Sequence, residues 1–176
     1  MSTPTPINIL MLCTGNSARS ILGEALFNHL GKGRVRACSA GSQPAGRVNP
    51  LALETLEKYG VPLPEAVRSK SWDEFAAPGA PQLDYIFTVC ASAAGDRDSM
   101  ASGQTCPIWP GHPATAHWGI DDPAHVEPLK ARRAAFETAY AQLERRIHAF
   151  LALPLESMTH ADVQLAARLI HEACCR

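Results

Sequence analysis

The chain has 176 residues, of which 46% are hydrophobic and 19% charged, a composition typical of one globular domain with a sizeable core. Sixteen Lys and Arg residues against seventeen Asp and Glu residues give a formal net charge of -1, which excludes recruitment of nucleic acid or an anionic membrane by net charge alone. Six cysteines without a secretory signal argue against a disulfide framework and predict thiol chemistry in the cytoplasm.

The predicted elements alternate between strands and helices along the chain. Short apolar runs predict strands at residues 7–13, 34–41, 84–90 and 114–120. Helical spacing predicts a helix from residue 20 that ends at the glycines of positions 31 and 33, a second over 49–61 and a long amphipathic one over about 127–151. This order predicts an α/β fold, in which helices flank both faces of a four-stranded parallel sheet.

Two stretches do not fit this compact plan. Residues 91–105 contain only one large apolar residue, Met100, so we expect a mobile loop there. Residues 154–176 predict a linker and one further helix, a C-terminal extension to a domain formed by residues 1–153. No run reaches the roughly 18 consecutive apolar residues of a membrane span, so we expect neither a membrane nor a nucleic-acid partner.

The segment CTGNSARS, residues 13–20, leaves the first strand and opens the first helix. Such a loop aims successive backbone N–H groups inward, where the helix dipole adds partial positive charge, so it predicts an oxyanion cradle. Gly15 permits the turn, and Arg19 offers a planar fork of donors for two oxygens. The expected oxyanion-binding residues are Thr14, Gly15, Asn16, Ser17, Ala18, Arg19 and Ser20.

Cys13 lies in the same electrostatic field and is the candidate nucleophile. The pKa of a free thiol, about 8.5, falls to roughly 3.5–7.5 near a helix N-terminus or a cation, so we expect a thiolate at neutral pH. Ser20 is expected to donate a hydrogen bond to that sulfur. The competing interpretation is a buried cysteine at a strand end beside a chance arginine.

With its C-x5-R-S spacing after the first strand, the chain resembles the low-molecular-weight protein tyrosine phosphatases from about residue 7 to residue 151. The resemblance implies that fold and a general acid aspartate followed by proline. Asp122 before Pro123 matches this pattern, and Asp121 is the adjacent rival. The alternative for Asp-Asp-Pro is a helix-start signal, because Asp before proline suits a helix N-cap.

Two later cysteines narrow the resemblance. Cys90 ends the third predicted strand and therefore shares a sheet edge with Cys13, and Cys106 follows after fifteen intervening residues, before Pro107. These residues look like the arsenate reductases that share the phosphatase fold, specifically the class with three redox cysteines. The insert between Cys90 and Cys106 is longer than is usual there, but each doubling of a loop costs only about 0.6 kcal/mol in closure entropy.

The resemblance implies a relay of three thiols. Cys13 attacks arsenate held by the loop and Arg19, and Cys90 then forms a disulfide with Cys13 as arsenite departs. Cys106 next attacks Cys90, which frees Cys13 and leaves a Cys90–Cys106 disulfide. Thioredoxin is the implied reductant of the resulting Cys90–Cys106 disulfide. Glutathione with glutaredoxin, or a mycothiol system, remains an alternative.

The other ligand-type residues receive no catalytic role. Cys38 is expected to pack within its strand, and Cys174 and Cys175 either form a frayed end with exposed thiols or capture trivalent arsenic or exchange with the relay. We expect no metal centre and no resident cofactor, because paired ligands at zinc-type spacing are lacking. The resemblance also allows a structural potassium ion, because Asn16, Glu24 and Ser39 match part of its site. The fourth expected ligand, a carboxylate, is not evident, since Trp72 stands about where it should be.

Two other functions stay open at this point. The first is phosphotyrosine phosphatase action by the same Cys13, Arg19 and Asp122. Residues 91–105 lack the aromatic side chains that grip a tyrosyl ring, which favours a small inorganic anion. The second is a non-catalytic oxyanion sensor, against which the complete set of nucleophile, acid and resolving cysteines argues.

Overall fold

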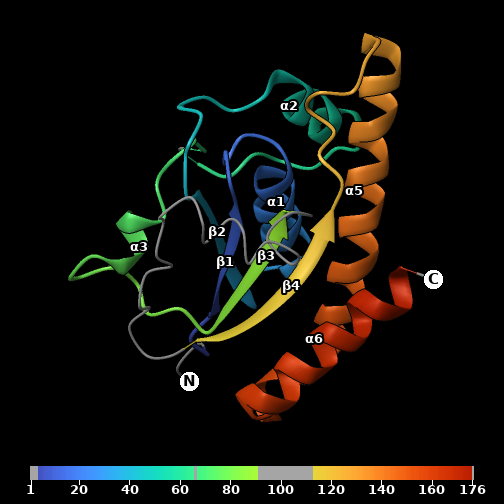
Figure 1. The fold of residues 1–176 in the computed structure, drawn as a ribbon. Coiled ribbons are helices and arrows are strands. Elements are labelled where there is room, and N and C mark those ends of the chain that lie inside the picture. Colours follow the sequence, from blue (N-terminus) through green and yellow to red (C-terminus); the bar gives the residue numbers. More distant parts are fainter. Residues whose placement is uncertain (1–3, 66, 91–112, 176) are drawn as a thin grey trace, which may run out of the picture.

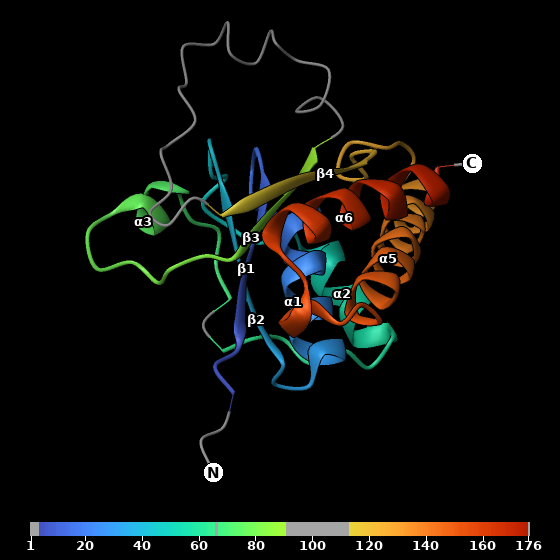
Figure 2. The ribbon, with the colours of Figure 1, turned by 90° about the horizontal axis from the view of Figure 1, so that it is seen from below.

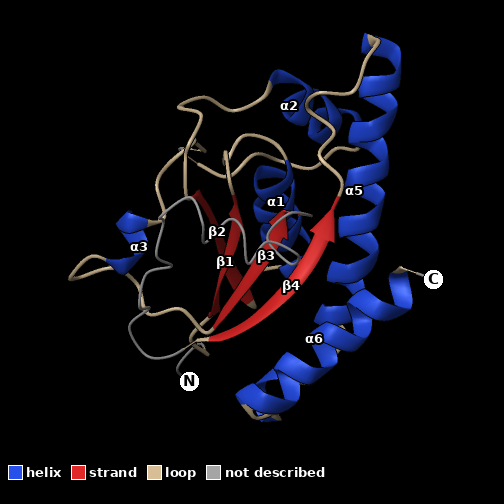
Figure 3. Ribbon diagram, in the orientation of Figure 1, coloured by secondary structure: helices blue, strands red, loops and turns tan. Residues whose placement is uncertain are grey.

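The computed structural model describes residues 4–65, 67–90 and 113–175, whose core is a four-stranded parallel sheet (Figure 1). The strands are β1 (Ile7–Cys13), β2 (Val35–Gly41), β3 (Tyr85–Cys90) and β4 (Ala114–Ile120), in the order β2-β1-β3-β4. The helices are α1 (Arg19–Gly31), α2 (Pro50–Lys58), α3 (Asp73–Ala76), α5 (Leu129–Leu151) and α6 (His160–Cys174), with a 3-10 turn, η2, at Leu155–Ser157 (Figure 3). The predicted α/β fold is confirmed.

Helices cover the two faces of the sheet unequally. The helices α1, α2, α5 and α6 pack on one face, and their apolar side chains form the larger core with the inward residues of the strands (Figure 2). Of the described residues, those of α3 and the chain around it lie on the other face, where Phe75 and Leu83 cover Leu10, Leu12 and Ile86. Because β1 has cover on both sides, it reads as a continuous apolar run rather than an alternating one.

The sheet register brings the first and third strands to a common edge. In β1, Leu12 lies opposite Thr88 of β3, and Cys13 lies opposite Gly41 of β2. All these strands run in parallel, so the segments that follow β1, β2 and β3 leave from the same carboxyl edge. Cys90, the last residue of β3, therefore ends at the edge where Cys13 ends β1.

Aromatic rings fill the centre of the larger core. Trp118 of β4 is fully buried, stacks against Phe27 of α1 and meets the edge of Phe150 of α5. Its Nε1 donates to the carbonyl of Ala167 in α6 at 2.9 Å, so the indole N–H is satisfied by the C-terminal helix. This helix packs on β4 and α5, and the division at residue 153 stays a prediction.

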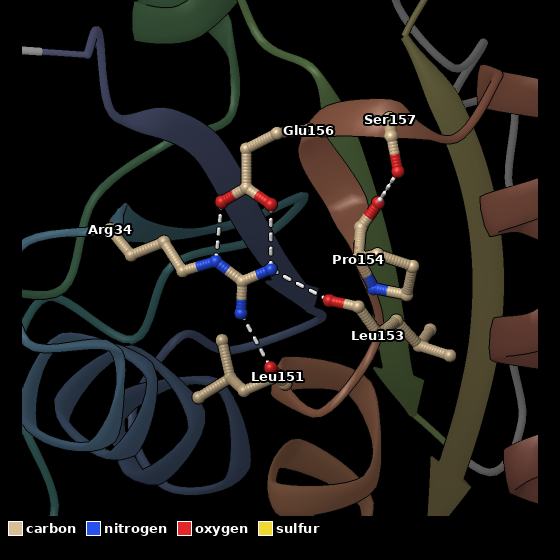
Figure 4. A network of polar contacts seen from close by, with 6 residues as sticks. All are labelled: Arg34, Leu151, Leu153, Pro154, Glu156 and Ser157. Atoms are coloured by element: carbon tan, nitrogen blue, oxygen red, sulfur yellow. Dashed lines mark hydrogen bonds and ion pairs between the residues drawn. The ribbon is translucent and has the colours of Figure 1, made fainter.

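Arg34, which directly precedes β2, binds the turn between α5 and α6 (Figure 4). Its guanidinium donates to the carbonyl oxygens of Leu151 and Leu153 and to both carboxylate oxygens of Glu156. Hydrogen bonding to Arg34 lowers the pKa of Glu156 to about 2, from an ordinary value of 4.5. One arginine thereby satisfies the last carbonyl of α5, a carbonyl of the turn that follows it and an adjacent acid.

The Glu156→Gln variant is expected to lose less than about 1 kcal/mol of unfolding free energy at pH 7, because the carboxylate side chain is 56% exposed and screened. The pKa of Glu156 is depressed in the folded state, so its contribution is present above about pH 4.5 and is lost as the pH falls toward 2. Urea unfolding of both proteins at pH 7 and pH 3 measures this. A difference that grows on acidification would contradict the pairing.

The predicted loop over residues 91–105 lies outside the described residues. Among the helices of the described chain, none is long and apolar enough to cross a membrane.

Candidate active site

The loop between β1 and α1 is held by a row of backbone hydrogen bonds from one neighbouring segment. The carbonyl oxygens of Cys13, Thr14, Gly15 and Ser17 accept bonds from amides within residues 42–49. In a trans peptide the C=O and the following N–H point in opposite directions. The amides that follow these carbonyls therefore face away from residues 42–49, as an oxyanion cradle requires.

Asn16 stabilises the loop through two hydrogen bonds of its side chain. It is fully buried and has a left-handed backbone with φ 44°, a conformation that asparagine tolerates better than most residues. Its Oδ1 accepts from the Lys70 amide at 2.9 Å, and its Nδ2 donates to Ser20 Oγ at 2.8 Å. The amide side chain thus joins the loop to α1 and to the segment before α3. The predicted Ser20 bond to the Cys13 sulfur stays a prediction.

The end of β2 passes directly behind this loop. A Cβ placed on Gly41 would lie 2.4 Å from the carbonyl oxygen of Thr14, which is backbone and has no freedom to retreat. Only glycine allows this close approach. The phosphate-loop shape is therefore encoded partly in residues 41–49, outside the CTGNSARS segment itself.

Arg19 begins α1 and carries its guanidinium over the loop. The residue is 8% exposed, and its Nη1 donates to the carbonyl of Ile120 at the end of β4 at 2.9 Å. Its Nε is buried and has no hydrogen-bond partner among the residues that the structure describes. A buried cationic donor without an acceptor is costly, so this nitrogen is suited to a bound anion.

Asp122 reaches the same place from the segment that follows β4. Its Oδ2 lies 3.5 Å from Arg19 Nη2, and its Oδ1 accepts from the Ala124 amide at 3.0 Å. With Cys13 and Arg19 it lines a cavity of about 470 Å³, whereas the neighbouring Asp121 is not among the lining residues. The geometry therefore favours Asp122 over Asp121 as the acid, although the role itself stays a prediction.

Sequence reasoning missed two other contributors to this cavity. Arg47, in the segment that bonds the loop, adds a second cationic side chain to its wall. His125 also lines it, with Nε2 4.0 Å from Asp122 Oδ2. Neither position carries a periodic or spacing signal in the sequence. Only the fold shows that residues 45–50 return to the loop.

The later cysteines are placed only in part. The backbone of Cys90 ends β3, beside the strand that ends in Cys13, as the sequence predicts. Cys106 lies outside the described residues. The relay among the three sulfur atoms therefore stays a prediction.

The family is decided by comparison with known proteins. The sequence model described as low molecular weight phosphotyrosine protein phosphatase matches residues 8–164. The chain belongs to this family. Among its similar curated relatives is the arsenate reductase of Shouchella clausii, 30% identical over 143 residues, which are 81% of this chain and 93% of the relative. The arsenate reductase of Bacillus licheniformis is 33% identical over 129 residues, 73% of this chain and 82% of the relative.

Solved structures agree with this membership of the phosphatase family. An arsenate reductase from Archaeoglobus fulgidus aligns with a TM-score of 0.59 at 27% identity, over 82% of this chain and 99% of the other. A thioredoxin-dependent arsenate reductase from Corynebacterium glutamicum aligns with a TM-score of 0.51 at 23% identity, over 83% of this chain and 64% of the other, and shows the shared fold. The predicted resemblance to both the phosphatases and the arsenate reductases is confirmed.

The potassium ion that the phosphatase-like reductases imply does not fit the residues present. Glu24 Oε2 accepts from Ser39 Oγ at 3.1 Å. The Asn16 side-chain amide already donates to Ser20 and accepts from the Lys70 backbone amide. Burial raises the pKa of Glu24, and the Lys70 charge opposes this effect. The polar atoms of these side chains bond each other or Lys70.

Proposed function

We propose that this protein is an arsenate reductase that uses the phosphate loop to bind arsenate and cysteine thiols to reduce it to arsenite. The observation that carries the proposal is the buried Nε of Arg19, which has no partner among the described residues and belongs to a side chain that lines the same cavity as Cys13. The arsenate reductases among its relatives match most of the chain. Thioredoxin or another thiol is the proposed reductant.

The first step is attack by the Cys13 sulfur on arsenic. The loop amides and Arg19 hold the arsenate oxygens, and Asp122 gives a proton to the oxygen that leaves as water. An arsenic–sulfur bond forms and an arsenic–oxygen bond breaks, with arsenic still pentavalent. Asp122 is suited to this role because it lies at the cavity wall, 3.5 Å from the guanidinium that holds the anion.

The second step transfers two electrons. The Cys90 thiolate attacks the Cys13 sulfur, and the bonding pair of the arsenic–sulfur bond stays on arsenic, which leaves as arsenite. Cys106 then attacks Cys90, releases Cys13 as a thiol and leaves a Cys90–Cys106 disulfide for the external dithiol. The adjacent β1 and β3 support the first exchange, since their ends share one edge of the sheet.

A small inorganic anion suits the cavity better than a phosphotyrosyl group. Of the described residues that line it, none is Phe, Tyr or Trp, so no aromatic face is available there to hold a tyrosyl ring. The polar wall instead includes two arginines, the carboxylate of Asp122 and the imidazole of His125. This observation favours arsenate over a protein phosphotyrosine as the substrate.

The Cys106→Ser variant is expected to complete about one turnover per chain and then stop, because the Cys13–Cys90 disulfide has no resolving thiol. Arsenite formation is measured against time with arsenate and excess thioredoxin, beside the wild-type protein. The expected trace is a burst of roughly one equivalent followed by a plateau. Sustained turnover with thioredoxin would refute the relay of three cysteines.

A further inference from the structure

A buried arginine lies far from the phosphate loop in sequence and outside its cavity. Arg146 of α5 is 2% exposed, and its Nε and Nη1 have no hydrogen-bond partner in the described part of the chain. No carboxylate of residues 4–65, 67–90 and 113–175 forms an ion pair with it. A buried positive charge without an anion is costly, so Arg146 favours a negatively charged group beside it.

The atom that Arg146 does contact is a sulfur at the end of the C-terminal helix. Its Nη2 donates to Cys175 Sγ at 3.5 Å, and the same sulfur lies 3.7 Å from His171 Nδ1. Burial lowers the pKa of His171, and the Arg146 charge adds to the effect. A guanidinium only donates, which makes the Cys175 sulfur the acceptor.

A second thiol stands next to the first. Cys174 is the last residue of α6 and half-buried, and Cys175 is the exposed C-cap of that helix. Adjacent Cα atoms are about 3.8 Å apart, so both thiols lie within reach of one small ligand. The end of α6 lies beside α5 in both ribbon views, and no α6 residue lines the cavity at Cys13 (Figures 1 and 2).

We propose that Cys174 and Cys175 form a second thiol site that binds trivalent arsenic through both sulfur atoms, with Arg146 stabilising the Cys175 ligand. Two sulfurs suit trivalent arsenic, which keeps a third substituent of its own. A zinc ion, by contrast, needs four ligands, and the described residues contain no cluster of three metal-ligating side chains. The choice of arsenic rests on the proposed function, whose product is arsenite.

Binding at this site is a ligand exchange without a change of oxidation state. Arsenous acid and two thiols form two arsenic–sulfur bonds, and two arsenic–oxygen bonds break. Two water molecules leave, and they carry away the two thiol protons. The site therefore needs no oxidant or reductant, and it retains the reduced product at a distance from the phosphate loop.

The test uses the full chain with Cys13, Cys90 and Cys106 replaced by serine, so that the relay thiols are absent. This variant is treated with phenylarsine oxide, a trivalent arsenical, in excess glutathione and is examined by intact-protein mass spectrometry. We expect one adduct per chain that resists glutathione and is removed by a dithiol. The adduct is expected to disappear when either Cys174 or Cys175 is also replaced by serine, because a single thiol forms no chelate.

Arg146 is tested in the same background. Arg146→Gln is expected to weaken retention of the arsenical about tenfold, while Arg146→Lys, which keeps the charge, preserves most of it. Circular dichroism shows whether each variant is folded. If Arg146→Gln does not fold, the test rests on retention of the arsenical by Arg146→Lys. An adduct that persists with both Cys174 and Cys175 replaced, or none in the relay-free chain, overturns the proposal. Wild-type arsenate turnover is measured separately, so a failure of the reductase assignment is a different result.

Discussion

Replacing Cys13 with serine is expected to lower arsenate reduction by at least about 10⁴-fold, because a serine hydroxyl is a far weaker nucleophile than a thiolate and does not form the disulfide. The loop amides and Arg19 stay in place, so arsenate and phosphate are expected to bind nearly as in the wild-type protein. The measurements are turnover with a thioredoxin system and anion binding by calorimetry.

A matched control exists in the same sheet. Cys38 of β2 is half-buried against the smaller core, and burial raises the pKa of its thiol. Cys38→Ser is expected to leave turnover within about twofold, since an inert packed thiol takes no part in exchange. If Cys13→Ser retained a cellular response to arsenate while losing turnover, the oxyanion-sensor alternative would return.

Deletion of residues 154–176 is expected to remove at least about 3 kcal/mol of unfolding free energy, and the shortened chain is expected to be largely unfolded at 37 °C. Leu155 and Val163 are buried in the larger core, and Ala167 accepts the hydrogen bond of the buried Trp118. Full burial of each large aliphatic side chain is worth about 1.5–3 kcal/mol. Urea unfolding followed by tryptophan fluorescence measures the loss.

The point variant Trp118→Phe separates the hydrogen bond from the packing. It removes the indole N–H and leaves the Ala167 carbonyl without that donor, at an expected cost of about 1–3 kcal/mol. A deletion variant as stable as the full chain would show that residues 1–153 form an independent domain with a dispensable extension.

The strands and the long helices were predictable because each carries a local signal. The β1 run INILMLC is apolar on both faces and ends at the cysteine, and the observed strand has the predicted bounds. Helix α2 begins where Asn49 caps it, its Oδ1 accepting from the Leu51 amide, and Pro50 fits the first turn. The phosphate loop was predictable for the same reason, since its residues are contiguous.

What the sequence could not show depends on long-range packing. Helix α3 has only four residues, too few for a helical period to register. Arg146 reads as a surface residue of an amphipathic helix, yet α6 covers it, and only the fold brings it to Cys175. Arg47 likewise has no spacing signal, because it reaches the cavity through the bonds between residues 42–49 and the loop.

The central claim is that arsenate bound at Cys13 is reduced by the chain's own thiols, and NADPH consumption tests it most directly. Purified protein is assayed with arsenate in a thioredoxin and thioredoxin reductase mixture, with a glutathione and glutaredoxin mixture in parallel. We expect sustained arsenate-dependent consumption of NADPH in the thioredoxin mixture. No arsenate-dependent NADPH consumption in either mixture, together with hydrolysis of an aryl phosphate, would contradict arsenate reduction and make the protein a phosphatase.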